Sequence, residues 1–377
     1  MSGIYFHIPY CKQACYYCDF HFSTNRNTQR EMVRAMTTEL EMRNDFLQQP
    51  VETIYFGGGT PSLLEIKQIA ALLEKVYALF KVERQAEITL EANPDDVTKE
   101  NLSGWKSLGI NRLSIGIQTF QQKYLHYMNR VHDTSTAQKA VELAQSEGFH
   151  NINLDLIYGI PHQTLQELYD DLLKFVALRP QHISAYCLTI EEKTVFGNLF
   201  KKRKLTPLSD EETADFFVKV SQFLTQNGFE HYEVSNFCLP NYYSRHNASY
   251  WQSKPYLGIG PSAHSYDGNM HRYSNVSNNA NYLQLIRQKI LPFHIEKLST
   301  ANRINEYIMT SLRTKWGCNL KYLQHHFNYD LLAQKGKLIT QKYLGKYLNI
   351  ENHCIVLTLE GKLLANTIAS ELFLDDL

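Results

Sequence analysis

Short apolar runs alternate with longer amphipathic segments over the first 190 residues of the chain. The segments between the runs, such as 30–47 and 63–80, repeat apolar residues at three- and four-residue spacing, which is typical of helices facing a core. Alternation of this kind predicts parallel strands joined by right-handed crossovers. Six such units fit a barrel or partial barrel better than a single nucleotide-binding fold. The predicted strands are 4–9, 51–58, 86–93, 111–118, 150–160 and 182–190.

The pattern becomes less regular after residue 190. Residues 229–266 are dense in Tyr, Asn, Ser, His and Gly, too aromatic for a disordered linker and too irregular for a simple helix. From about residue 296 helical periodicity returns, and the last segment predicts two small strands around a Glu360–Gly361 turn. We therefore expect a barrel over 1–230, an extension over 231–295, and a small helical or winged-helix-like module over 296–377.

Reactive or unusual residues follow five of the predicted strands. A cysteine loop follows the first strand and the run Gly57–Thr60 follows the second, while Glu91, Gln118 and Asp155 end or follow later ones. Barrel enzymes build their sites on the carboxyl edge of the strands. Five such strands in succession predict a functional site at this edge.

The cysteine loop contains Cys11, Cys15 and Cys18, one fewer than a closed metal site needs. Structural zinc takes four ligands, and a conventional iron–sulfur cluster takes four cysteines. Three thiolates can hold three irons of a cubane and leave the fourth iron open to a small molecule. A zinc site completed by His7 or His21 is the alternative. The other four cysteines are scattered, as ordinary buried residues are: Cys187, Cys238, Cys318 and Cys354.

Composition limits the class of protein further. The 377 residues are 44% hydrophobic and carry a formal net charge of +0, so charge gives no reason to expect nucleic acid as a partner. The N-terminus lacks the features of a signal peptide, and no apolar stretch reaches the roughly 18 residues that span a bilayer. Seven cysteines in this pattern do not form a disulfide framework. We expect a cytoplasmic protein.

A three-cysteine loop after the first strand, with a glycine run after the second, resembles the radical S-adenosylmethionine (SAM) superfamily. In that superfamily the fourth iron of a [4Fe–4S] cluster is chelated by the amino and carboxylate groups of SAM. Glycines at 57–59 let the backbone approach a ligand closely, and its carbonyls can accept hydrogen bonds from an ammonium group. Glu91 then supplies a carboxylate for the positive charge of the ligand.

Seven motifs, in order, resemble the oxygen-independent coproporphyrinogen III dehydrogenase (HemN-like) family. They are YFHIPYCKQACYYCDF, YFGGGTPS, EANPD, RLSIGIQTF, LDLIYGIP, YEVSNF and YLGIGPSAHS, and with the C-terminal module they cover most of the chain. That family binds two SAM molecules. The resemblance assigns the first SAM to Tyr5, Gly58 and Glu91. It assigns the second to Tyr17, Gly59, Thr60, Gln118, Arg130 and Asp155, with Thr189 as a looser correspondence.

Two departures from the dehydrogenase resemble instead the heme chaperone (HemW) branch of the family. Phe20 stands where the dehydrogenase has a further cysteine, and the chain begins four residues before Tyr5, without the long N-terminal extension. The branch also has an HNxxYW motif, present here with His246, Tyr250 and Trp251. Imidazole is a common heme ligand and flat aromatic rings can cover a porphyrin.

The resemblance therefore implies heme binding and delivery to acceptor hemoproteins, such as respiratory enzymes met peripherally at a membrane. It also implies an electron-donor protein, and it leaves a homodimer open. Cys238 is a competing candidate for the heme ligand, and no catalytic residue is assigned. The alternative function is oxidative decarboxylation of coproporphyrinogen III. A cluster-based electron-transfer protein without SAM is disfavoured by the glycine run and Glu91.

Overall fold

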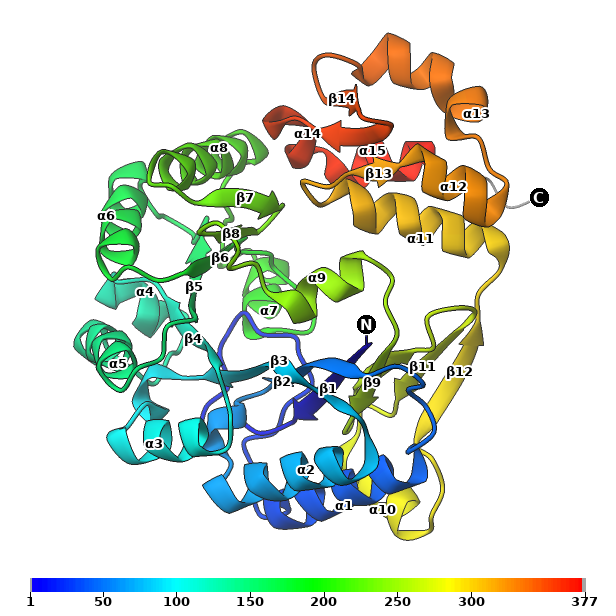
Figure 1. Cartoon of the computed structure of the whole chain (residues 1–377). Helices are drawn as coiled ribbons and strands as arrows, with labels where there is room; N and C mark the ends of the chain where they lie inside the picture. The colour runs from blue at the N-terminus through cyan, green and yellow to red at the C-terminus, as the bar shows by residue number, and fades with distance from the viewer. Residues whose placement is uncertain (1, 375–377) are drawn as a thin grey trace.

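A computed structural model describes residues 2–374 and places six parallel strands side by side in chain order (Figure 1). In-register pairing brings Tyr5 of the first strand beside Tyr55 of the second. The predicted partial (β/α)6 barrel is confirmed. The six strands are β1 (Ser2–Ile8), β2 (Val51–Gly58), β3 (Val82–Ala92), β4 (Arg112–Gln118), β5 (Ile152–Tyr158) and β6 (His182–Cys187).

Amphipathic helices join these strands and cover the outer face of the sheet (Figure 1). Thr164 and Ser209 begin two of them with capping boxes, in which the cap side chain and a glutamate three residues later exchange hydrogen bonds with the backbone. The helices are α1 (Gln29–Met42), α2 (Ile66–Leu79), α3 (Lys99–Ser107), α5 (Thr134–Ser146), α6 (Leu165–Ala177) and α8 (Asp210–Gln226), with short α4 (Gln122–Tyr127) and α7 (Val195–Lys201).

Residues 230–297 extend the same sheet at both edges. On one side β8 (Asn236–Cys238) pairs antiparallel with β6 and carries β7 (Glu230–Glu233). On the other side β9 (Tyr256–Ile259) lies parallel to β1 and is followed by β10 (His264–Tyr266), β11 (His271–Asn275) and β12 (Phe293–Lys297). Helices α9 (Arg245–Trp251) and α10 (Asn279–Arg287) belong to this region. One core runs from Ile4 to Ile286, and the division at residue 230 stays a prediction.

The C-terminal residues have a core of their own, built on helices and a small antiparallel sheet. The predicted turn at Glu360–Gly361 is wrong. The hairpin turns at Asn352 and His353, which both have positive φ, whereas the Thr358 side chain caps a helix by accepting a hydrogen bond from the Gly361 backbone. The elements are α11 (Thr300–Leu312), β13 (Cys318–Asn319), α12 (Leu320–Phe327), α13 (Leu331–Leu338), the π-helical η3 (Ile339–Tyr343), β14 (Leu348–Glu351), β15 (Cys354–Leu357), α14 (Leu359–Leu363) and α15 (Ala365–Leu372).

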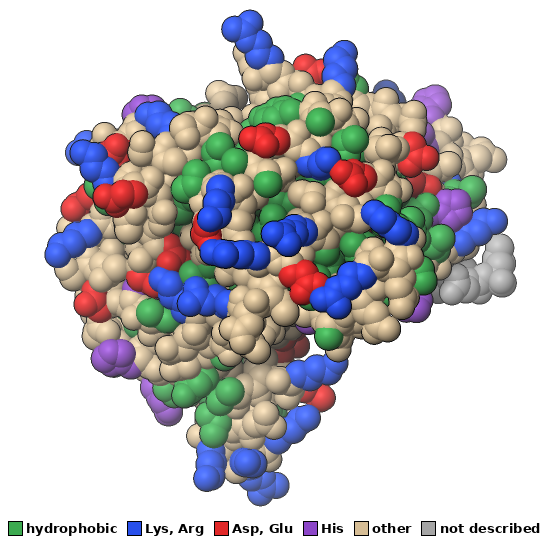
Figure 2. Space-filling model, turned by 90° about the horizontal axis from the view of Figure 1, so that it is seen from below, with side chains coloured by type: hydrophobic (Ala, Val, Ile, Leu, Met, Phe, Trp, Pro, Cys, Tyr) green, Lys and Arg blue, Asp and Glu red, His purple; other side chains and the backbone are tan. Residues whose placement is uncertain are grey.

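The surface has mixed charge. On the face seen from below in Figure 2, lysine and arginine side chains alternate with acidic ones and with scattered apolar groups. Among residues 2–374, no helix combines the length and the apolar character needed to cross a bilayer.

Candidate functional site

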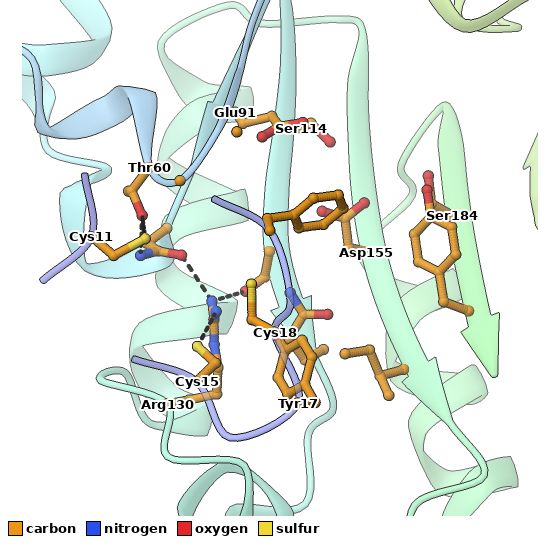
Figure 3. Close-up of a pocket in the computed structure, with 18 of the residues that line it drawn as sticks. Cys11, Cys15, Tyr17, Cys18, Thr60, Glu91, Ser114, Arg130, Asp155 and Ser184 are labelled. Carbon is orange, nitrogen blue, oxygen red and sulfur yellow. Dashed lines mark hydrogen bonds between the residues drawn. The ribbon is translucent and has the colours of Figure 1, made fainter. Parts of the chain in front are cut away.

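The three clustered cysteines line one cavity at the carboxyl ends of the barrel strands (Figure 3). They lie on the loop between β1 and α1, and the cavity has a volume of about 490 Å³. The backbone of the glycine run meets this loop directly, because the amides of Gly59 and Thr60 donate to the carbonyls of Ile8 and Tyr10 at 2.9 and 2.7 Å. The two motifs that the sequence analysis singled out are therefore adjacent in space.

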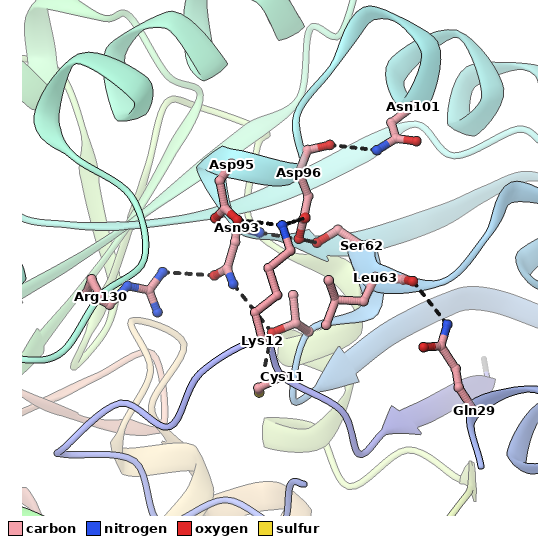
Figure 4. Close-up of polar contacts among 11 residues, drawn as sticks. Cys11, Lys12, Gln29, Ser62, Leu63, Asn93, Asp95, Asp96, Asn101 and Arg130 are labelled. Carbon is pink, nitrogen blue, oxygen red and sulfur yellow. Dashed lines mark hydrogen bonds and ion pairs between the residues drawn. The ribbon is translucent and has the colours of Figure 1, made fainter. Parts of the chain in front are cut away.

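A charged side chain fixes the start of the cysteine loop to the turn after β3 (Figure 4). The ammonium group of Lys12 pairs with Asp95 at 2.5 Å and also with Asp96. The Asp96 carboxylate is held in turn by the hydroxyl of Ser62, at 2.7 Å. Further along the loop, the Asn129 side chain donates to the backbone carbonyl of Ala14 at 2.8 Å. These contacts hold the cysteine loop over the site.

The thiols lie next to donors that favour a sulfur anion. The Thr60 hydroxyl donates to the Cys11 sulfur and the Arg130 guanidinium to the Cys15 sulfur, both at 3.4 Å. Burial raises the pKa of Cys11 to about 11 and that of Cys18 to about 12. Iron binds thiolate and releases the proton on binding, so these buried thiols are suited to a metal rather than to a free anion.

The arrangement fits a cluster better than a single metal ion. Among the described residues, no three His, Cys, Asp or Glu side chains converge on one ion-sized point. A cubane, in contrast, takes each cysteine on a different iron. Of the two candidate fourth ligands for zinc, His7 hydrogen-bonds through both ring nitrogens, to the Tyr5 hydroxyl at 3.2 Å and to the His21 carbonyl at 2.8 Å. The other candidate, His21, contacts the Asn279 side chain at 2.8 Å.

The glycine run is required by packing as well as by any ligand. A Cβ at Gly59 would lie 2.7 Å from the carbonyl oxygen of Tyr10, and Gly58 has a φ of +106° with His7 against it. Side chains at either position would push the cysteine loop away from β2. Gly58 and Gly59 also line the cavity, so their backbone is open to a ligand there.

Two half-buried carboxylates face the same cavity and have raised pKa values. Burial raises the pKa of Glu91 to about 7, against the opposing effect of a 2.7 Å hydrogen bond from Tyr55. Burial likewise raises the pKa of Asp155 to about 6, although Asn153 donates to it at 2.7 Å. A cationic ligand would stabilise the charged form of these carboxylates, and SAM carries a sulfonium and an ammonium group.

The cavity brings together most of the residues predicted for SAM. Gln118 reaches it from a left-handed backbone conformation, with φ of 71°, which is unusual for a side chain of this type. Tyr5 is the exception, since it lies outside this cavity. The predicted residues that line it are Cys11, Cys15, Tyr17, Cys18, Gly58, Gly59, Thr60, Glu91, Gln118, Arg130, Asp155 and Thr189.

The residues predicted for heme do not share one environment. His246 is 1% exposed, and its two ring nitrogens contact the Thr53 hydroxyl at 2.8 Å and the Tyr250 hydroxyl at 2.7 Å. To bind iron, the His246 side chain would have to break one of these hydrogen bonds and leave its place between the body of α9 and strand β2. Tyr250 and Trp251 line a second cavity. Cys238 is buried in β8, where burial raises its pKa to about 12.

Several site residues were not predicted from the sequence. Arg112 is buried at the start of β4, and its charge faces the cavity. Asn93 accepts a 2.8 Å hydrogen bond from Arg130 and lies two residues after Glu91, so the strand-end pattern could have identified it. Tyr55 sits in the middle of an apolar run and carried no signal. Asn247, which belongs to the HNxxYW motif predicted for heme, lines the cluster cavity from α9 instead.

Comparison with known proteins agrees with this fold and site. Residues 5–175 match the profile of the Radical SAM superfamily, and the barrel with its three-cysteine loop defines a radical SAM protein. The chain is 34% identical to the heme chaperone HemW of Lactococcus lactis subsp. lactis (strain IL1403), over 100% of this chain and 98% of that protein. It is 33% identical to the heme chaperone HemW of Bacillus subtilis (strain 168), over 98% of each. The chain belongs to the HemW heme chaperone family.

A solved structure shares the whole fold. Coproporphyrinogen III oxidase (HemN) from Escherichia coli, a radical SAM enzyme, superposes with a TM-score of 0.85 over 99% of this chain and 90% of its own. The two are 23% identical, so the likeness concerns the fold.

Proposed function

We propose that this chain binds heme and delivers it to acceptor hemoproteins, with a [4Fe–4S] cluster and SAM bound in the cysteine-lined cavity. The observation that carries the proposal is the match over the whole length to heme chaperones of two organisms, at 34% and 33% identity. The geometry agrees with it, because the cluster residues and all the predicted SAM residues except Tyr5 line one cavity, and a second, aromatic cavity adjoins it.

In this proposal the three cysteines hold the cluster, and the bound cluster supplies an open iron for SAM. Arg130 stabilises the Cys15 thiolate by a charged hydrogen bond. Lys12 keeps the loop in place through its two aspartates. The half-buried carboxylate of Glu91 then pairs with a positive charge of SAM in the cavity.

The carboxylate and arginine groups are expected to orient SAM rather than to exchange protons with it. Arg130 is fixed by 2.8 Å hydrogen bonds to the Asn93 side chain and the Gly116 carbonyl, while its Nε is buried without a partner. An unpaired N–H of this kind is costly unless a ligand accepts from it. The SAM carboxylate is a suitable acceptor.

The decisive experiment is anaerobic reconstitution of the cluster followed by parallel assays on one sample. Hemin titration followed by absorbance should show saturable binding at a defined ratio. Coproporphyrinogen III with SAM and a reductant should give no protoporphyrinogen IX. Robust product formation would instead favour the dehydrogenase, whose fold this chain shares.

A further inference from the structure

A second cavity, of about 620 Å³, adjoins the cluster cavity, and of the residues predicted for SAM only Tyr5 lines it. Its volume is in the range of cavities that take small organic ligands and cofactors. It is bounded by β1, by the α9–β11 part of the sheet extension, and by α11 of the C-terminal module. Asp19 and Phe20 line both cavities, so the end of the cysteine loop is their common wall.

Aromatic rings form much of the second cavity. The rings of Tyr250 and Tyr256 pack edge to face with centroids 4.5 Å apart, and Trp251 and Tyr266 complete this wall. Phe20 is 68% exposed at the boundary with the cluster cavity. An exposed phenyl ring beside an aromatic cavity can cover one face of a large, flat, apolar ligand.

The cavity lining carries two basic side chains, Lys254 and Arg272, and two acidic ones, Asp19 and Glu306. Lys254 makes no ion pair or side-chain hydrogen bond with any other residue in the described part of the chain. Arg272, by contrast, pairs with Glu306 of α11 at 2.7 Å, so most of its charge is neutralised. Lys254 is therefore the group that is available to pair with a carboxylate on a ligand.

Three histidines line the cavity, and they differ in what their ring nitrogens contact. His7 is engaged at both nitrogens, and His21 contacts the Asn279 side chain at 2.8 Å. His264 is exposed, and no side-chain hydrogen bond joins it to another described residue. The ring nitrogens of His264 are therefore open to a metal ion, which imidazole binds in its neutral form.

The motif YLGIGPSAHS places this histidine. A Cβ on Gly258 would lie 1.9 Å from the His264 carbonyl oxygen, so only glycine lets β9 pack against the start of β10. Gly260, with φ of +103°, similarly passes close to the carbonyl of His7. The two glycines thus bring His264 to the same cavity as β1 and the cysteine loop.

We propose that this second cavity is the heme site, with His264 as the axial iron ligand. The proposal rests on the proposed function and adds its location and ligand. The aromatic wall and Phe20 cover the porphyrin, Lys254 pairs with a propionate, and the His264 imidazole coordinates iron. His246 then lies behind the aromatic wall, where its hydrogen bond to the Tyr250 hydroxyl positions that ring, and it does not contact the heme.

The test uses the full-length, cluster-reconstituted protein and hemin as the probe, followed by absorbance and electron paramagnetic resonance. His264→Ala should remove the imidazole-ligated spectrum. Lys254→Gln should weaken hemin binding by roughly tenfold, the effect of losing one charged contact, but should leave the binding of hemin dimethyl ester unchanged. His294→Ala, an exposed histidine on β12, is the matched control. Cluster absorbance and the unfolding midpoint report whether each variant is folded.

The outcomes separate this inference from the proposed function. If the wild type binds no hemin, the function and the site both fail. If the wild type binds hemin and His264→Ala keeps the imidazole spectrum, the function stands and the ligand assignment is overturned. Loss of the imidazole-ligated spectrum in His21→Ala but not in His264→Ala would also overturn the ligand assignment. Equal weakening of hemin and its dimethyl ester in Lys254→Gln would overturn the propionate contact.

Discussion

Replacement of His246 by alanine should destabilise the protein, and the loss should depend on pH. The ring has two hydrogen bonds, of 2.8 and 2.7 Å, and it stacks on Tyr55 with centroids 5.0 Å apart. Each bond contributes about 1 kcal/mol net, and loss of the buried ring about 1 kcal/mol more. The expected cost at pH 8 is therefore about 3 kcal/mol, which lowers the unfolding midpoint of a chain of this size by about 4 °C.

The pH dependence follows from the buried state of the ring. Burial, with a smaller contribution from Arg112, lowers the pKa of His246 to about 3. An unfolded histidine titrates near 6.5, so below that pH the unfolded wild type binds a proton that the folded protein excludes. At pH 5, about 1.5 units lower, the wild type loses about 2 kcal/mol that the alanine variant does not lose. The difference should therefore shrink to about 1 kcal/mol, or about 1 °C.

Calorimetry of wild type, His246→Ala and the surface control His294→Ala at both pH values tests this reasoning. The control should stay within about 0.5 kcal/mol of wild type at each pH. An unchanged midpoint for His246→Ala, together with loss of its heme spectrum, would refute the reasoning. That result would show a histidine that leaves its buried position to bind iron.

Three further predictions concern the cluster cavity. Alanine at any one of the three loop cysteines should abolish the iron–sulfur absorbance after reconstitution, whereas Cys354→Ala should keep it, because Cys354 lies in the C-terminal sheet; equal loss in both would contradict the cluster assignment. Glu91→Gln should weaken SAM binding roughly tenfold at pH 8 in calorimetric titration. At pH 6 the effect should be much smaller, since a pKa of about 7 leaves the free protein's Glu91 mostly protonated there; a pH-independent effect would remove Glu91 from the charge pairing. Lys12→Ala should slow cluster assembly and speed its loss in air, because the loop loses its anchor on Asp95 and Asp96; unchanged kinetics would show that the anchor is dispensable.

The barrel and its cluster loop could be predicted because their signals are local. The spacing of apolar residues and the reactive residues at strand ends can both be recognised within short stretches of sequence. Parallel strands then bring their carboxyl ends to one edge of the sheet. Glu91 and Asp155 were predicted in this way to lie at one site, and both line one cavity although they are far apart in the sequence.

The extension could not be predicted in the same way, because its placement depends on contacts with distant residues. The parallel pairing of β9 with β1 joins residues about 250 positions apart, as in the pair Gly3 and Tyr256. His246 looks like a loop histidine in the sequence, yet in the fold it is buried and hydrogen-bonded to Thr53, about 190 positions away. The role of Lys12 likewise depends on Asp95 and Asp96.

The most direct test of the central claim is heme transfer. The reconstituted protein is loaded with hemin, freed of excess by gel filtration, and mixed with a heme-free respiratory enzyme, whose regained activity is followed in time. We predict activation faster and more complete than with the same concentration of free hemin, and spectral loss of heme from the chaperone at the same rate. Retention of heme by this protein with no activation of the acceptor, or activation no faster than by free hemin, would contradict a chaperone function.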